Sequence, residues 1–391
     1  MAILVLNAGS SSLKFTLFDA EQPALPRLLH GEYAGLGGAV RLHIADEADT
    51  VHCDASPPLT DHEAAVGHLL DWLEASHLAP LVAAAGHRVV HGGADHHAPA
   101  RVDADLLAAL RALVPLAPLH LPHNLAAIEA LARRQPDLPQ VACFDTAFHR
   151  TMPEVEQRYA LPEAWFARGV RRYGFHGLSY EYIAGELPRH LGAAADGRVV
   201  VAHLGHGASL CALRERRSVA TTMGFTPLDG IPMATRPGQL DPGVVTWWLR
   251  EAGLDVAAVD DLLNHHSGLA GLSGTSGDMR ALLASDAPAA RRAVDYFVHH
   301  TARAIASLAG ALGGLDALVF TAGIGEHAAE IRARVCRRLA WLGLRLDPTA
   351  NAAHATRLSA PDSPASVWRI PTDEARIIAR HTRRLLREDP A

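Results

Sequence analysis

The chain has 391 residues, of which 49% are hydrophobic and 20% charged, and its formal net charge is −6. This length exceeds what one hydrophobic core usually organises, so we expect two domains. The mildly acidic balance argues against a nucleic acid or an anionic membrane surface as partner. No apolar run is long enough for a transmembrane helix, so we expect no membrane partner.

The cysteines and the first residues indicate the compartment. Cys53, Cys143, Cys211 and Cys336 are widely spaced and form no CxxC pair, as is typical of reduced thiols. The opening MAILVLN has too short an apolar run for a signal peptide and no basic leader. We therefore expect a cytoplasmic protein.

In chain order, residues 2–19 are predicted to form a β-hairpin, because AILVL and SLKFTLFD flank the turn NAGSS. The pattern returns in residues 198–213 (RVVVAHLGHGASLCAL). A third strand, in residues 317–332, runs into a glycine turn and then into an arginine-rich helix. Turns of this kind leave backbone N–H groups free to face anions, so these three segments are candidate phosphate-binding turns.

Helices alternate with these strands. Short buried strands are predicted at LVAAAGHRVV and QVACFD. The alternation of β and α segments favours α/β layers, and the two similar hairpins suggest a duplicated α/β domain with a cleft between the copies. We place the boundary near residues 148–153. The predicted helices are 103–113, 124–134, 181–190 and 289–312.

Several common sites are not favoured. GxxxxGK[ST] is absent because Leu13 precedes the lysine, GxGxxG fails at both glycine pairs, and GLSGTSG lacks GxSxG spacing. His87 with His91, and His120 with His123, have short spacings, but there is no HExxH, so a zinc site is not favoured among the 24 histidines.

Lys14 is the only lysine of the chain, since arginine stands at all other Lys/Arg positions. The Ala- and Arg-rich usage is typical of GC-rich coding, which replaces lysine wherever arginine serves. Lysine is a compact point charge, whereas arginine is a broad planar fork. Lys14 therefore predicts a narrow polyanion site, the alternative being survival by chance.

A series of segments, in order along almost the whole chain, resembles the acetate kinase family. Each fragment alone is weak evidence, but the series is specific. The segments are LVLNAGSSSLKF (4–15), GHRVVHGG (86–93), PLAPLHLPHN (115–124), FDTAFH (144–149), RRYGFHG (171–177), HLGHGAS (203–209), TTMGFTPLDGIPMATRPGQLDP (221–242), SGLAGLSGTSGDMR (267–280), FTAGIGEHAAEIR (320–332) and IPTDEARIIARHT (370–382).

The resemblance implies two duplicated actin-like, ribonuclease H-like α/β domains with an active-site cleft between them. The first would hold residues 1–149 plus 375–391, with the first phosphate loop and the acetate side. The second, residues 150–374, would hold the second phosphate loop, the adenosine site and the interface of a homodimer. The implied reaction is reversible, direct in-line transfer of the ATP γ-phosphoryl to acetate, giving acetyl phosphate and ADP for acetyl-CoA biosynthesis, with Mg²⁺ or alternatively Mn²⁺.

The resemblance also implies roles for single residues. Arg88 and Arg236 match the two active-site arginines, whose guanidinium forks suit carboxylate and phosphoryl oxygens. His176 matches the histidine that donates to the moving phosphoryl group, and His120 a second, less critical one. Asp145 and Glu374 match the acidic residues that arrange the metal, with Asn7 beside them.

Binding residues follow in the same way. Val90, Leu119, Phe175 and Pro227, with Arg88, match the acetate pocket, although each alone could be an ordinary core residue. Val90 narrows this pocket, but one methylene discriminates by only ~1–3 kcal/mol. Arg280 alone could equally be a surface ion pair. The residues matching the ATP site are Ser10, Ser12, Lys14, His203, Gly205, His206, Gly207, Asp278, Met279, Arg280, Gly323, Ile324 and Gly325.

The chain departs from the family pattern beside these residues, which leaves three readings. The first is an acetate kinase with altered kinetics. The second is a kinase for propionate or butyrate. The third is a nucleotide-binding paralogue with weakened catalysis, although the retained transfer residues speak against it. The departures are Leu121 for Asn, Tyr180 for His, His206 for Asn, Ala234 for Gly, Pro237 for Ser, Gln239 for Asp and His327 for Asn.

Overall fold

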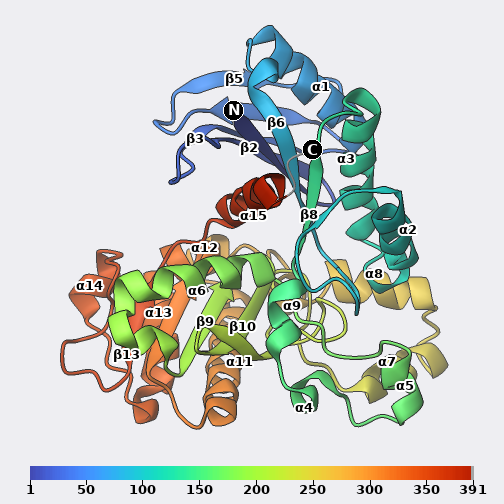
Figure 1. The fold of residues 1–391 in the computed structure, drawn as a ribbon. Helices are drawn as coiled ribbons and strands as arrows, with labels where there is room; N and C mark the ends of the chain where they lie inside the picture. The colour runs from blue at the N-terminus through green and yellow to red at the C-terminus, as the bar shows by residue number, and fades with distance from the viewer. Residues whose placement is uncertain (389–391) are drawn as a thin grey trace. The chain divides into compact units, whose positions relative to one another are not determined.

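A computed structural model describes residues 1–388, which fall into two compact units (Figure 1). Unit 1 holds residues 1–148 and the chain from Asp373 onward, and unit 2 holds residues 149–372. Glu374, which we expected at the end of the second domain, thus belongs to unit 1. Each unit contains one β-sheet with helices, which confirms the α/β class.

The sheet of unit 1 has the strand order β5-β4-β3-β2-β1-β6-β8-β7. β1 and β2 form the predicted antiparallel hairpin, in which Asn7 lies opposite Lys14, and the turn is closed by Gly9 N donating to Ser12 O at 2.8 Å. β1 runs parallel to β6, and β6 parallel to β8. The strands are β1 Ala2–Ala8, β2 Ser12–Asp19, β3 Arg27–Ala34, β4 Arg41–Ala45, β5 Val51–Ala55, β6 Val82–Val89, β7 Ala100–Arg101 and β8 Gln140–Phe144.

Helices cover both faces of this sheet, as the burial of nearly every residue of β1 requires. Leu4 and Leu6 pack with residues of helices α1 and α3 in one core cluster. Helix α15 lies on the other face, so close to β6 that a Cβ on Gly86 would come within 2.5 Å of Ile378. The α-helices of unit 1 are α1 His62–Ala75, α2 Ala104–Ala112, α3 Leu121–Arg134 and α15 Glu374–Glu388.

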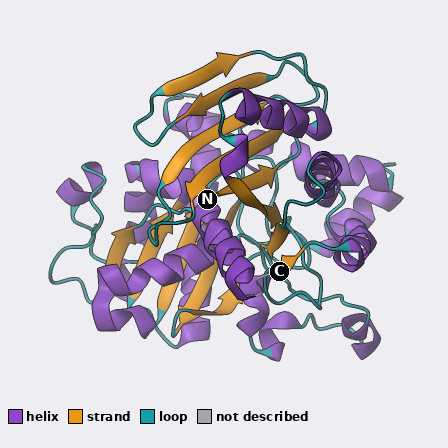
Figure 2. Cartoon of the chain, turned by 45° about the horizontal axis from the view of Figure 1, so that its top comes forward, coloured by secondary structure: helices purple, strands orange, loops and turns teal. Residues whose placement is uncertain are grey.

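Unit 2 has a five-stranded sheet of order β11-β10-β9-β12-β13, seen as orange arrows in Figure 2. β9 and β10 form the second predicted hairpin and are antiparallel, while β12 runs parallel to β9. Helix α11 packs on β10 and β11, and helices α6 and α12 contact β9 (Figure 1). The strands are β9 Val199–Leu204, β10 Ala208–Arg214, β11 Arg217–Thr221, β12 Ala317–Thr321 and β13 Ser366–Arg369.

Local signals explain where the helices of unit 2 begin and end. Pro288 occupies the first turn of α11, where its missing N–H costs nothing, and Gly313 ends that helix with φ 72°. Asp255 caps α8 by accepting from Ala258 N at 2.8 Å. The α-helices are α4 Glu154–Gln157, α5 Glu163–Ala167, α6 Gly177–Leu191, α7 Pro242–Arg250, α8 Val256–His265, α9 Gly268–Ser273, α10 Met279–Leu283, α11 Pro288–Leu312, α12 Ala322–His327, α13 Ala329–Arg338 and α14 Pro348–Ala352.

The helices predicted from sequence are confirmed within a few residues as α2, α3, α6 and α11. The third glycine segment is different from the prediction. Gly323 and Gly325 lie inside the short helix α12 instead of in an open turn, and Ala322, the first residue of that helix, has a positive φ of 63°. Within residues 1–388, no helix is both long and apolar enough to cross a membrane.

Three buried histidines, His87, His91 and His149, make stability depend on pH. Burial lowers the pKa of each to about 4, from 6.5. The unfolded chain therefore binds more protons than the folded chain between these values. The stabilisation is complete above pH 6.5 and is lost as the pH falls toward 4.

We expect the free energy of unfolding to fall below pH 6.5 by ~1.4 kcal/mol per pH unit for each buried histidine. Urea titrations at pH 7.5 and 5.5 measure this. His87→Gln should flatten the pH dependence, whereas His77→Gln at an exposed position should not. An equal pH dependence in the wild type and in His87→Gln would contradict the assignment.

Candidate active site

Arg88 is the centre of a polar cluster at the strand ends of unit 1. Its guanidinium donates to both oxygens of Asp145, with Nη2–Oδ2 at 2.5 Å and Nε–Oδ1 at 3.2 Å, and to Asn7 Oδ1 at 3.2 Å. Glu374 Oε2 lies 4.0 Å from Arg88 Nε. The structure thus brings together Arg88, Asp145, Asn7 and Glu374, which are far apart in the sequence.

The topology explains this meeting. Arg88 is near the carboxyl end of β6, and Asp145 directly follows β8, its parallel neighbour. Asn7 lies near the end of β1, parallel to β6 on its other side, and Glu374 is the first residue of α15. Because carboxyl ends of parallel strands meet at one edge, the sheet itself collects these groups.

Charges within the cluster are balanced. Burial opposes the charge of Arg88, but the negative charges of Asp145 and Glu374 outweigh it and raise its pKa. Burial raises the pKa of Glu374, while the positive charges of Arg88 and Lys14 counteract this rise. Arg88 therefore stays cationic, and Lys14 is close enough to influence Glu374.

Lys14 itself is more exposed than the narrow-site interpretation expects. Its side chain is 60% exposed, and Nζ lies 3.8 Å from Glu32 Oε1 on the neighbouring strand. An exposed pair of this kind contributes little to stability. The role of Lys14 toward phosphate stays a prediction, as do those of Ser10 and Ser12 in the adjoining turn.

Asn124 is a positioning residue that the sequence did not single out. Its Oδ1 accepts from Val90 N at 3.0 Å, and its Nδ2 donates to Ala8 O at 2.8 Å. It thereby ties the end of β6 to the end of β1, beside Arg88 and Asn7. The only signal was its place as the last residue of the quoted segment PLAPLHLPHN.

His176 is the N-cap residue of helix α6 in unit 2 and has a left-handed conformation, φ 58°. Such a conformation is uncommon for a residue with a side chain and needs support from its surroundings. His149 supplies it, since its Nε2 donates to Phe175 O at 2.9 Å. Gly174 precedes it with φ 74° and leaves no room for a Cβ, which would come within 2.6 Å of the His149 ring.

In unit 2, the side chains of His176, His203 and Arg236 meet near the loop between β9 and β10. A Cβ built on Gly207 would lie 2.7 Å from Arg236 Nη2 and 3.3 Å from His176 Nε2. Arg236 Nη1 donates to Pro227 O at 2.8 Å, which fixes the guanidinium. His203 stacks on His176 with ring centroids 4.3 Å apart.

The residues matching the adenosine site have varied surroundings. Asp278 caps α10 by accepting from Arg280 N at 2.7 Å, and its Oδ2 lies 3.2 Å from the Arg280 guanidinium, which is 91% exposed. Met279 is buried in the core. The surface ion pair that we considered for Arg280 is therefore present, and its contact with nucleotide stays a prediction.

Arg332 organises the helix that carries Gly323, Ile324 and Gly325. It is fully buried, and its Nη1 donates to Gly325 O and Glu326 O at 2.9 and 2.8 Å. Burial lowers its pKa to about 10, so it remains charged at neutral pH. Sequence reasoning missed this role, although Arg332 closes the quoted segment FTAGIGEHAAEIR.

The four expected pocket residues are divided between the units. Val90 and Leu119 belong to unit 1, and Phe175 and Pro227 to unit 2. Val90 and Phe175 are buried, whereas Leu119 is 38% exposed. Their convergence on one methyl group stays a prediction, and so does a role for His120, which precedes α3.

Three of the departures from the family pattern are accommodated locally. Ala234 has no positive φ, so a Cβ is tolerated, and its N donates to His206 O at 3.1 Å. Leu121 is completely buried in α3. Gln239 accepts from Arg303 Nη2 at 2.9 Å.

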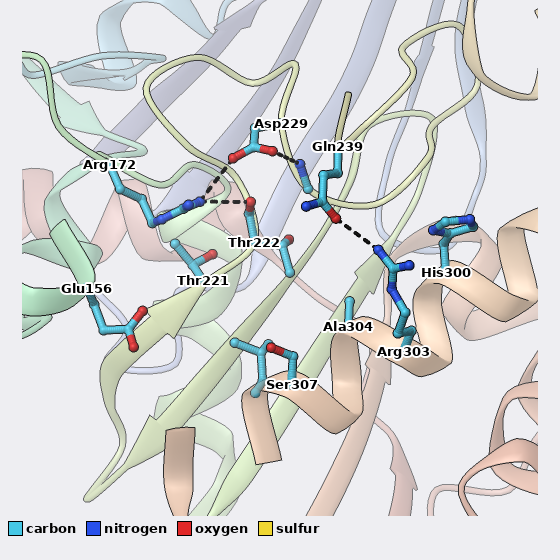
Figure 3. Close-up of a pocket in the computed structure, with 12 residues that line it drawn as sticks. Glu156, Arg172, Thr221, Thr222, Asp229, Gln239, His300, Arg303, Ala304 and Ser307 are labelled. Carbon is cyan, nitrogen blue, oxygen red and sulfur yellow. Dashed lines mark hydrogen bonds and ion pairs between the residues drawn. The ribbon is translucent and has the colours of Figure 1, made fainter. Parts of the chain in front are cut away.

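Unit 2 contains a cavity of about 470 Å³, and Figure 3 shows residues that line it. Arg172 in its wall is occupied by Asp229 and by the carbonyls of Thr222 and Met223, and Arg303 by Gln239. The residues expected to transfer phosphoryl do not line it, and its guanidinium groups are already paired. We therefore assign it no ligand.

Gly207→Ala should move Arg236 and His176 without unfolding the chain, because the new Cβ meets the far ends of two side chains and no backbone. A shift of about an ångström costs on the order of 100-fold in rate, so we expect that loss in kcat of the expected transfer reaction. Gly185→Ala in α6, where nothing lies within 4 Å, is the control. Wild-type kcat in Gly207→Ala would refute the crowding argument.

Known proteins agree with the resemblance. The sequence profile of the Acetokinase family matches residues 2–380. Acetate kinases of Rhodopseudomonas palustris and Rhizobium meliloti are 55% and 50% identical, with 98% of both chains covered in each case. A propionate kinase from Francisella tularensis superposes with a TM-score of 0.92 at 36% identity, and the acetate kinase of Porphyromonas gingivalis with 0.89 at 34%, each covering 98% of this chain and 99% of the other. The chain belongs to the acetokinase family.

Proposed function

We propose that the protein is an acetate kinase, which transfers the γ-phosphoryl group of ATP to acetate, reversibly and in line, giving acetyl phosphate and ADP. Family membership supports a phosphotransferase with a carboxylate acceptor. The observation that carries the proposal is the cluster in which Arg88 holds Asp145, Asn7 and Glu374. A protein that only binds nucleotide has no need of it.

The same cluster suits a magnesium ion. Glu374 and Asn7 offer a carboxylate and an amide oxygen as ligands, and buried Asp145, held by Arg88, would orient the site. Mg²⁺ prefers such hard oxygen ligands while keeping water and phosphate in its remaining positions. When bound, the ion would neutralise negative charge on the phosphates. Mn²⁺ accepts the same donor set and is the alternative ion.

The remaining groups act by position and charge. Arg88 would bind the carboxylate of acetate or the transferred group, and Arg236 the equatorial oxygens of that group, because a guanidinium fork matches both geometries. His176 would donate to the same oxygens. Since phosphoryl transfer needs little covalent help from a protein, such clamping supplies most of the catalysis.

A propionate kinase is the second candidate, favoured by the likeness to the Francisella tularensis enzyme. Val90 argues for the smaller acid, because its branched side chain takes up volume where we expect the methyl group of acetate. The preference that one methylene can produce is only ~1–3 kcal/mol.

We also propose a cytoplasmic homodimer that serves acetyl-CoA biosynthesis. Helix α7 supports a second copy as partner, since it has no buried residue and leaves Trp247 56% exposed. Large exposed aromatic side chains are enriched where proteins associate.

Acyl-phosphate formation tests the function. The protein, ATP and Mg²⁺ are incubated with acetate, propionate or butyrate, and the product is trapped with hydroxylamine. We expect acetyl hydroxamate to form fastest, to vanish with a chelator, and to fall by at least ~100-fold in Arg236→Ala. Arg345→Ala, a surface pair with Asp362, is the control. No acyl phosphate from any acid would refute the proposal, and a faster reaction with a longer acid would favour the second candidate.

Lys14→Arg tests the sole lysine. We expect kcat to fall markedly while the unfolding midpoint stays unchanged, because a wide guanidinium replaces a compact charge near Glu374. Glu32→Gln removes the partner of the surface pair and is the matched control. Equal kcat values for Lys14→Arg and the wild type would mean that lysine survives there by chance.

A further inference from the structure

Tyr180, Ser209 and His176 form a chain of hydrogen bonds inside unit 2. The hydroxyl of Tyr180, on helix α6, lies 2.5 Å from Ser209 Oγ on strand β10. Ser209 Oγ in turn lies 2.8 Å from His176 Nδ1. Tyr180 and Ser209 are both fully buried, so water does not compete for these bonds.

Burial fixes the direction of the first bond. The pKa of Tyr180 is raised well above its usual value by burial, so the phenol keeps its proton. A buried O–H without an acceptor is costly, and among residues 1–388 the hydroxyl of Tyr180 has Ser209 Oγ as its hydrogen-bond partner. Tyr180 therefore donates, and Ser209 Oγ accepts.

The second bond follows from the first. Ser209 has one hydroxyl proton, and its oxygen already accepts from Tyr180. The proton of Ser209 is then directed to His176 Nδ1, which must accept it. A neutral imidazole whose Nδ1 accepts carries its proton on Nε2.

We propose that Tyr180 and Ser209 are positioning residues, which hold His176 as the tautomer with its proton on Nε2. That nitrogen lies 3.3 Å from the position that a Cβ on Gly207 would take, and Arg236 Nη2 lies 2.7 Å from the same position. The inference rests on the proposed function, in which His176 donates to the transferred phosphoryl group. The Nε2-protonated tautomer gives neutral His176 the N–H group with which it would donate to the phosphoryl oxygens.

The proposal also accounts for a departure from the family pattern. Tyrosine stands at position 180 where the resemblance leads us to expect histidine. A histidine can either donate or accept, whereas a buried phenol has one proton and must place it. Tyr180 therefore fixes the direction of both hydrogen bonds, from Tyr180 to Ser209 and from Ser209 to His176.

Removing the phenol hydroxyl of Tyr180 should allow His176 to adopt either tautomer. In Tyr180→Phe, Ser209 Oγ can accept from a protonated Nδ1, and His176 then presents an acceptor to phosphate oxygens. We expect kcat to fall on the order of 10-fold or more with KM for acetate and ATP nearly unchanged. Ser209→Ala should act similarly, and the double variant should be no slower than the slower single variant.

Tyr33→Phe is the matched control, because Tyr33 is equally buried and its hydroxyl lies 2.9 Å from His68 Nδ1 in unit 1. Tyr33→Phe removes a buried phenol hydroxyl but leaves the hydrogen bonds from Tyr180 through Ser209 to His176 intact, so kcat should stay at the wild-type value. Multiplicative losses in the Tyr180→Phe, Ser209→Ala double variant would indicate two independent packing defects and overturn the proposal.

A spectroscopic readout does not depend on turnover or on a folded variant at position 180. In wild-type protein labelled with ¹⁵N-histidine, the signals absent from His176→Gln belong to His176. We expect a protonated Nε2 and an unprotonated Nδ1. A protonated Nδ1 would overturn the proposal even if acetyl phosphate forms normally. Absence of acetyl phosphate with the expected tautomer would instead refute the proposed function.

Discussion

The pairing of Arg88 with buried Asp145 is the constraint on which unit 1 depends. A carboxylate with no exposed surface is costly unless its charge is met, and two guanidinium nitrogens meet it. The same guanidinium reaches Asn7 and approaches Glu374, so one cation sets the spacing of three oxygen groups. The protein's own charges thereby hold together the groups at which we propose that a divalent ion and phosphate bind.

In unit 2 the candidate groups are held by hydrogen bonds and ring stacking instead of by paired charges. His176 has a left-handed backbone conformation, and His149 stabilises it by donating a hydrogen bond to the carbonyl of the preceding residue, Phe175. Its ring is held by His203 on one face and by Ser209 at Nδ1. The donor role that we propose for His176 depends on its tautomer and orientation more than on charge.

Sequence patterns predicted the fold where periodicity and glycine turns are strong. Both hairpins and the four predicted helices are confirmed, since apolar runs, glycine turns and helical periodicity are local features. The Gly323 segment was predicted wrongly because a strand followed by glycines reads the same whether the glycines open a turn or begin a helix. The Arg88 cluster depends on parallel pairing of β1, β6 and β8, which spacing alone does not encode. The family resemblance identified the residues of the Arg88 cluster, and the pairing of β1, β6 and β8 explains why they lie together.

Residues that act through others were harder to predict. Asn124 binds backbone atoms at the ends of two distant strands, and Arg332 donates to the carbonyls of Gly325 and Glu326 in the preceding helix. Nothing in the sequence marks these partners. The departures from the family pattern illustrate the same point in reverse. Ala234 keeps the loop contact through its backbone N–H to His206 O, a bond that does not depend on either side chain. Where backbone atoms make the contact, side chains can change without loss of geometry, so positions 206 and 234 can differ from the family pattern while their backbone contact stays.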